Sequence, residues 1–309
     1  MRKDGLTRNA IFSRCWWITG FLLILCFAQA SALYAAPFLW KAEKDDVSFY
    51  MFGTIHLPDP RVLDLSDSVN QALEESTVMY TELDLGDENM LKMANAVRLP
   101  EGESLLDILS PELQARVNTL LVDISPSLSL QLLANQKIWA LAVTLPILEQ
   151  QLNHPNQPAL DGQLYQSALK AGKQVGGIET MEEQLGIFEG LTLAQQVKVL
   201  EDTVEFMEDA KEANTDVLDS MIQPYLVGDL DGLYAALMAY MKDEPLYHQL
   251  TDELIYDRNQ HMVERMHALS SKHTQEKFFY AIGVGHFAGE EGIPSLLVEQ
   301  GYTIERVAE

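Results

Sequence analysis

The pattern of apolar and polar residues predicts strands at both ends of the chain and helices between them. Near the start, two runs rich in aromatic and branched side chains, 38–43 and 47–53, are separated by the charged residues 44–46. Such a pattern is typical of a β-hairpin. Near the end, the runs 277–283 and 302–307 predict two further strands, and the segment 293–301 between them predicts a helix.

Patterns in the first third of the chain predict a strand–helix–strand unit. Leu65, Val69 and Leu73 recur every four residues, which predicts a short amphipathic helix that begins near Ser66. The apolar run 77–85 that follows is typical of a buried strand. Because two strands joined by a helix usually run parallel, we expect a parallel pairing through a crossover.

Two long helical blocks are expected between the strands, at about 88–172 and 192–269. Ser110 followed by Pro111 is a typical helix start, and Thr192 with Gln195 fits a capping box. A helix at 160–171 leads into a short strand at 174–178. The sequence thus predicts an α/β fold, in which a mixed central sheet is built from both chain ends and carries two large helical insertions.

The first 32 residues have the pattern of a signal peptide. Basic residues precede an apolar run at 15–30, which small residues follow, and we expect cleavage after Ala32, with Ala35 or Ala36 as alternatives. A retained membrane anchor is disfavoured because the run is short of the roughly 20 apolar residues that span a bilayer. We therefore expect a periplasmic or secreted protein with a single domain at 33–309. Both cysteines, Cys15 and Cys26, lie in the signal, so the mature chain would have no disulfide.

The charge and the remaining apolar segments limit the partners. A net charge of −25 makes nucleic acid a poor partner. The apolar segment 138–148 is too short to span a bilayer and predicts a buried helix, so we expect no stable membrane insertion after signal cleavage. The oligomeric state is left open by the sequence.

Two Gly-x-x-His segments mark the candidate site. Gly53 precedes His56, Gly283 precedes His286, and both histidines follow predicted strands, as do Glu82 and Glu179. In α/β folds, ligands bind beyond the carboxyl ends of the strands, so we expect these side chains to converge there. Each glycine would let the backbone turn sharply or approach a ligand closely.

Histidine and carboxylate side chains together are usual ligands of divalent metals. Two histidines and one glutamate would leave positions open for a water whose pKa the metal lowers to about 7, the chemistry of a metal-dependent hydrolase. The alternative is that each strand-end histidine is a hydrogen-bonded structural residue. The segment 283–289 resembles a phosphate loop, but too few residues follow it for a dinucleotide fold.

Several stretches, in a fixed order from about Phe38 to Val307, give the chain a family resemblance. They are "FLWKAE", "YMFGTIHLPD", "VMYTELD", "GKQVGGIETMEEQ", "DRNQHM" and "AIGVGHFAGEEGIPSLLVEQGYTIERV". In these the sequence resembles the TraB/GumN family, which includes the TIKI metalloproteases. That family lies in a wider group with erythromycin esterases and ChaN-like haem-binding proteins.

The resemblance implies that His56, Glu82 and His286 line the active site and bind a divalent metal, Mn²⁺, Co²⁺ or Zn²⁺. It also implies that Arg258 and Asn259 face this site from a helix. Arg258 would bind a substrate carboxylate or an anionic intermediate, and Asn259 would supply an amide ligand or orient a water.

Glu179 and Thr180 are positions typical of the family. For Glu179 there is also a structural interpretation, in which its carboxylate holds backbone amides of a loop or helix. If Glu82 is a metal ligand, another carboxylate has to act as the general base, and Glu179 and Asp84 are the candidates.

The leading hypothesis is therefore an exported metal-dependent hydrolase that acts on peptides. A rival hypothesis is a non-catalytic periplasmic binder of metal, haem or peptide at the same cleft. A third is a structural protein whose histidines stabilise turns. The partner in the first two cases is a peptide or another small molecule.

Overall fold

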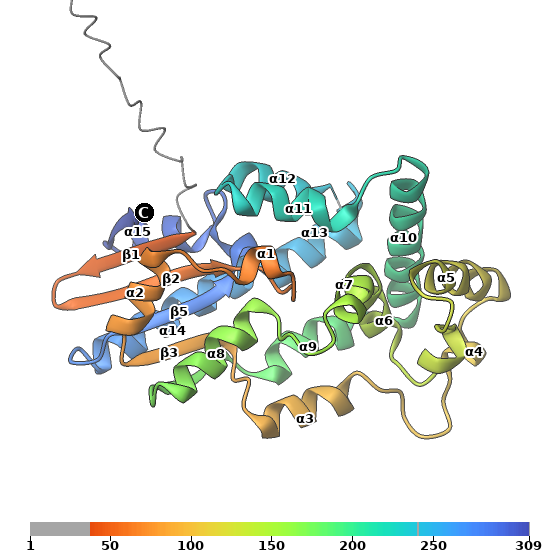
Figure 1. Ribbon diagram of the computed structural model, residues 1–309, viewed down its shortest axis with the longest axis horizontal. Coiled ribbons are helices and arrows are strands. Elements are labelled where there is room, and N and C mark those ends of the chain that lie inside the picture. Colours follow the sequence, from red (N-terminus) through yellow and green to blue (C-terminus); the bar gives the residue numbers. More distant parts are fainter. Residues whose placement is uncertain (1–37, 240, 309) are drawn as a thin grey trace, which may run out of the picture. The chain divides into compact units, whose positions relative to one another are not determined.

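The computed structural model describes residues 38–239 and 241–308 (Figure 1). The predicted signal peptide at 1–32 lies outside these residues. A six-stranded sheet with the order β4-β3-β5-β2-β1-β6 forms the centre of the fold. Its strands are β1 (Leu39–Lys44), β2 (Val47–Thr54), β3 (Val78–Leu83), β4 (Gln174–Glu179), β5 (Phe278–Gly283) and β6 (Thr303–Arg306).

The sheet is mixed and is built from both chain ends, as the sequence predicted. β2, β5, β3 and β4 run parallel, whereas β1 is antiparallel to both β2 and β6. β2 and β3 have the predicted parallel direction, but they are not neighbours because β5 lies between them. Every residue of β5 is buried, and a wholly apolar strand is best accommodated in the interior of a sheet.

Helices cover both faces of the sheet. On β5, Phe278 and Tyr280 pack on one face with residues of helices α14 (Asp257–Lys272) and α15 (Ile293–Glu299). Phe279 packs on the other face with residues of α2 (Asp67–Glu75) and α8 (Leu160–Lys170). The parallel strands therefore lie between two helical layers, and their carboxyl ends are left as the place where polar side chains can gather.

Most of the other helices lie in the two regions in which helices were expected. The first region holds α3 (Asp87–Ala96), α4 (Leu105–Ile108), α5 (Pro111–Ile124), η1 (Leu130–Leu133), α6 (Ile138–Thr144), η2 (Leu145–Ile147), α7 (Leu148–Asn153) and α8. The second holds α10 (Leu193–Glu212), α11 (Val217–Leu226), α12 (Leu230–Met238), α13 (Pro245–Thr251), η3 (Asp252–Tyr256) and α14, and α9 (Met181–Gly190) lies before it. The short helix α1 (Pro60–Leu63) follows β2. In Figure 1, α4, α5, α6 and α10 group together, and α5, α6 and α10 share a core of their own.

The helix starts predicted from capping residues are confirmed. Ser66 caps α2, Ser110 caps α5, and Thr192 forms the capping box of α10. The sequence analysis did not predict α9, although Thr180 opens it with a capping box of the same kind. The segment predicted as a buried helix contains α6, most of whose residues are buried. In the part of the chain described here, no helix has both the length and the apolar character that a bilayer span requires.

Candidate active site

The two Gly-x-x-His segments meet at one edge of the sheet. β2 and β5 are adjacent parallel strands, and His56 and His286 both follow their carboxyl ends. Glu82 lies at the end of β3, the other neighbour of β5. The Nε2 atoms of His56 and His286 each lie 3.8 Å from Oε1 of Glu82. The three side chains that the sequence analysis selected as a set therefore converge.

The two glycines of these segments serve different purposes. A Cβ on Gly283 would lie 3.0 Å from Glu82 Oε1 and 3.3 Å from His56 Nε2, so its absence makes room for the converging side chains. A Cβ on Gly53 would lie 3.0 Å from side-chain atoms of both Phe38 and Val284, so this glycine permits close packing. Neither glycine has a positive φ, since Gly283 has φ −51° and Gly53 lies within β2, so both serve the close approach that was the second expected use.

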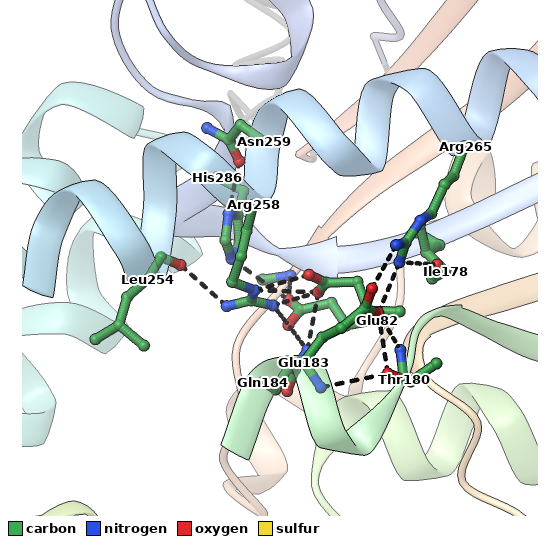
Figure 2. Close-up of polar contacts among 12 residues, drawn as sticks. Glu82, Ile178, Thr180, Glu183, Gln184, Leu254, Arg258, Asn259, Arg265 and His286 are labelled. Carbon is green, nitrogen blue, oxygen red and sulfur yellow. Dashed lines mark hydrogen bonds and ion pairs between the residues drawn. The ribbon is translucent and has the colours of Figure 1, made fainter. Parts of the chain in front are cut away.

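A buried amide orients the imidazole of His286. Figure 2 shows Asn259 of α14 next to this ring, and its Oδ1 lies 2.7 Å from His286 Nδ1. Because Nδ2 of Asn259 donates to the Glu291 carbonyl at 2.7 Å, Oδ1 is left to accept the Nδ1 proton of His286. Burial lowers the pKa of His286 to about 4, although Glu82 opposes this shift. At pH 7 the ring is neutral, and its Nε2 lies 3.8 Å from Oε1 of Glu82.

A carboxylate holds the imidazole of His56. Nδ1 of His56 lies 2.6 Å from Oδ2 of Asp161, and Oδ1 of Asp161 accepts from the Thr54 hydroxyl at 2.5 Å. The side chain of His56 is 59% exposed, whereas that of His286 is 6% exposed. Asp161 is the main reason that the pKa of His56 rises to about 9, against the effect of desolvation.

Asp161 is the residue that the sequence analysis missed. It lies in the first turn of α8, which was predicted, together with Leu164, Tyr165 and Ala168 on the buried face of that helix. An acidic residue on the apolar face of an amphipathic helix is unusual, because an ionised carboxylate is costly to bury without a partner. That pattern was the available signal in the sequence.

Glu82 is held as an anion by groups from three directions. Its Oε1 accepts from the backbone amide of Gly283 at 2.6 Å, and its Oε2 accepts from Arg258 at 2.6 Å and from Gln184 at 3.1 Å. Burial favours the neutral acid, but the neighbouring His286, Arg258 and His56 and the Gly283 amide favour the anion, and together they outweigh burial. The pKa of Glu82 is therefore well below its usual range.

Arg258 connects two of the predicted site carboxylates. Its Nη2 lies 2.7 Å from Glu179 Oε2, in addition to its contact with Glu82, and its Nε lies 3.1 Å from both oxygens of Glu179. Nη1 donates to the carbonyl of Leu254 in the π-helical turn η3, as Figure 2 shows. Burial opposes its charge, yet the two carboxylates raise the pKa of Arg258. The guanidinium is thus largely committed to protein partners.

The two candidate general bases lie in different surroundings. Glu179 accepts from Arg258 and, at 3.0 Å, from Gln184 of α9, so its described partners are side chains rather than backbone amides. Asp84 accepts from the Gly86 amide and the Tyr165 hydroxyl, and no described hydrogen bond joins it to the other site residues. Of the two, only Glu179 shares partners with Glu82. Gln184 was missed because α9 was missed.

The side chains of this site are of the types that bind a divalent cation, but the distances between their ligand atoms are longer than such an ion requires. Within residues 38–239 and 241–308, no three His, Cys, Asp or Glu side chains are placed to ligate one ion as they stand. A tetrahedral ion with bonds of about 2.0–2.2 Å holds its ligand atoms roughly 3.3–3.6 Å apart, and here both N–O separations are 3.8 Å. The donor set nevertheless fits, since each histidine has its Nδ1 held by an outer partner and its Nε2 near a carboxylate oxygen.

Comparisons with known proteins give one family match and several relatives. Residues 38–306 match the TraB/PrgY/gumN family. "Metalloprotease TIKI1" of Danio rerio is 29% identical over 87% of this chain, and the protein of that name in Homo sapiens is 27% identical over the same share. "Metalloprotease TIKI homolog" of Nematostella vectensis is 26% identical, also over 87% of the chain. The matches cover 62%, 61% and 67% of those relatives, so the chain spans about two thirds or less of their length. No solved structure matches the chain.

Proposed function

This chain belongs to the TraB/PrgY/gumN family, and on that premise we propose that it is an exported metal-dependent hydrolase of peptide bonds. The observation that carries the proposal is the meeting of His56, His286 and Glu82 at the ends of three neighbouring strands. The relatives named metalloproteases support the reaction class.

The three converging side chains would hold the metal. His286 is neutral and Glu82 is ionised near pH 7, the states in which each ligates a cation. His56 has to release its Nε2 proton to the solvent, which its exposure allows. A bound divalent cation lowers the pKa of a water and polarises the scissile carbonyl.

Neighbouring side chains would keep these groups in position. Arg258 fixes Glu82 and Glu179 side by side, and Asn259 fixes the ring of His286. Since His56 is the exposed member of the set, we assign the approach of the substrate to its side. Glu179 is the candidate proton acceptor, because it reaches the same guanidinium as Glu82.

Digestion of a peptide library tests the reaction. The mature protein is incubated with Mn²⁺, Co²⁺ or Zn²⁺ beside His56→Ala and His286→Ala, and His273→Ala at the exposed end of α14 is the matched control. We expect fragments from the wild type and the control and none from the two site variants. If no metal produces fragments but peptide or haem is retained, the protein is a binder and the hydrolase proposal is wrong.

Export is a separate part of the proposal. The basic residues, apolar run and small residues of the first 32 positions support it. Mass spectrometry of the protein recovered from the producing cells should find an amino terminus at Leu33, with Ala36 or Pro37 for the alternative cuts. Recovery of the intact terminus in the membrane fraction would instead support a retained anchor.

A further inference from the structure

The two histidines of the candidate site are supported unequally. His286 is 5% exposed, so the surrounding protein limits the orientations of its ring. The side chain of His56 is 59% exposed and follows a strand end, where packing alone leaves several rotamers accessible. A metal-binding side chain that becomes ordered only when the metal binds weakens the affinity by the conformational entropy that it loses. His56 therefore needs an additional constraint that His286 does not need.

The Asp161 carboxylate is built to supply that constraint. It is 7% exposed, and its two oxygens are divided between His56 and Thr54. Thr54 is fully buried within β2 and donates its hydroxyl proton to Oδ1, which leaves Oδ2 for the imidazole. Among the described residues, the ion pair recorded for Asp161 is with His56. The buried charge thus has a partner that is itself exposed.

We propose that Asp161, fixed by Thr54, is a positioning residue that holds the exposed ring of His56 with Nε2 toward Glu82. It keeps the proton on Nδ1 and prevents rotation of the ring into solvent. Asn259 has the corresponding place behind His286, but there the ring is already buried. The inference rests on the proposed function only where a metal is concerned, because the orientation of His56 belongs to the protein alone.

Substitutions at Asp161 separate the charge from the hydrogen bond. Asp161→Asn keeps an oxygen that accepts from His56 Nδ1 and an amide that can donate to Thr54, so it removes mainly the charge. Asp161→Ala removes both. Thr54→Val removes the hydroxyl that orients the carboxylate and keeps the branched shape of the side chain. We expect the order of effect to be Asp161→Ala, then Asp161→Asn, then Thr54→Val.

The first measurement is metal affinity, by competition with a coloured chelator for Zn²⁺ or Co²⁺. Loss of an outer partner of a metal-binding histidine typically weakens affinity about 10–100-fold, and we expect Asp161→Ala to fall in that range. Asp202→Ala is the matched control, because Asp202 is similarly buried and lies in α10 with Lys198, Lys242 and Tyr247 as partners. It should leave the affinity of a folded protein unchanged.

The second measurement needs no metal. In nuclear magnetic resonance spectra of the metal-free protein, the Nδ1 proton of His56 should be protected from exchange with water. Asp161→Ala should abolish that signal and leave the Nδ1 proton of His286 in place, and Asp161→Asn should retain it in part. A protected His56 proton and an unchanged affinity in Asp161→Ala would overturn the inference. If the wild type binds no metal, the proposed function fails, and the proton signal still decides the role of Asp161.

Discussion

The two Gly-x-x-His segments look alike in sequence and both place a histidine beside Glu82, but the surroundings of their histidines differ. His286 is buried, neutral and held by the Asn259 amide, whereas His56 is exposed and held by the Asp161 carboxylate. The glycine of the second segment makes room for the site, and the glycine of the first permits packing. The comparison teaches that equal spacing placed two imidazoles at one carboxylate, while the surroundings gave each its own charge and support.

The largest effect is expected from removing either histidine. His56→Ala and His286→Ala should each weaken metal binding by more than about 100-fold, since even an outer partner is worth about 10–100-fold. Stability should separate the two variants. His286→Ala leaves the buried oxygen of Asn259 without its donor, which costs about 1–3 kcal/mol, whereas His56→Ala leaves the buried carboxylate of Asp161 without its ion-pair partner and should cost more. Titration calorimetry and urea unfolding measure the two quantities, and equal losses of stability would contradict the comparison.

Arg258→Met should produce the next largest effect, on the stability of the whole site. It leaves Glu82 and Glu179 buried without their shared cation, and breaking a buried ion pair costs about 3–5 kcal/mol. Urea unfolding of the metal-free protein measures this loss. Protonation of Glu82 and Glu179 removes this unpaired charge. The variant should therefore lose less stability than the wild type when the pH is lowered from neutral to acidic values. A loss below about 1 kcal/mol at pH 7 would show that the pair is not buried in solution.

Alanine substitutions at the two glycines should affect different properties, metal affinity at Gly283 and stability at Gly53. Gly283→Ala introduces a Cβ 3.0 Å from Glu82 Oε1 and should weaken metal binding while leaving most of the stability intact. Gly53→Ala introduces a Cβ 3.0 Å from Phe38 and Val284, and overpacking of this kind costs about 1–3 kcal/mol of unfolding free energy. Parallel measurements of affinity and unfolding on both variants test the assignment. If Gly53→Ala instead loses metal binding and keeps its stability, the roles assigned to the two glycines are the wrong way round.

The smallest effect is expected at an exposed ion pair beside the site. Arg265 lowers the pKa of Glu183 to about 2, and the Thr180 amide adds to this shift. Since the folded pKa lies below the unfolded one, the pair stabilises the protein above pH 4.5 and loses its effect as the pH falls toward 2. Both side chains are more than a third exposed, so the contribution is about 1 kcal/mol or less. Arg265→Gln should reduce the acid dependence of unfolding in that window, and an effect as large as that of Arg258→Met would contradict the contrast between the two pairs.

Much of the fold could be predicted because its signals are local. Ser66 and Thr192 start helices through hydrogen bonds within four residues of themselves, and the run at 277–283 identifies β5 by its apolar residues alone. The insertion of β5 between β2 and β3 could not be predicted, because it depends on which strand the sheet buries best. The same applies to the layers of helices over the two faces.

The candidate site, too, was predicted only in part. His56, Glu82 and His286 were found because each follows a strand, and the carboxyl ends of parallel strands lie at one edge. Asp161 and Gln184 reach that edge from helices, and spacing along the chain does not indicate which turn of a helix faces it. Asp161 was marked only by being an acid on an apolar helix face.

The central claim is that the two segments bring His56 and His286 to one metal with Glu82. A crystal structure of the protein loaded with Co²⁺ or Zn²⁺, with anomalous scattering recorded at the absorption edge of that metal, tests it most directly. The account predicts one anomalous peak about 2.0–2.2 Å from His56 Nε2, His286 Nε2 and Glu82 Oε1. A loaded protein whose metal lies elsewhere, or whose three side chains stay as they are with no peak between them, would contradict it.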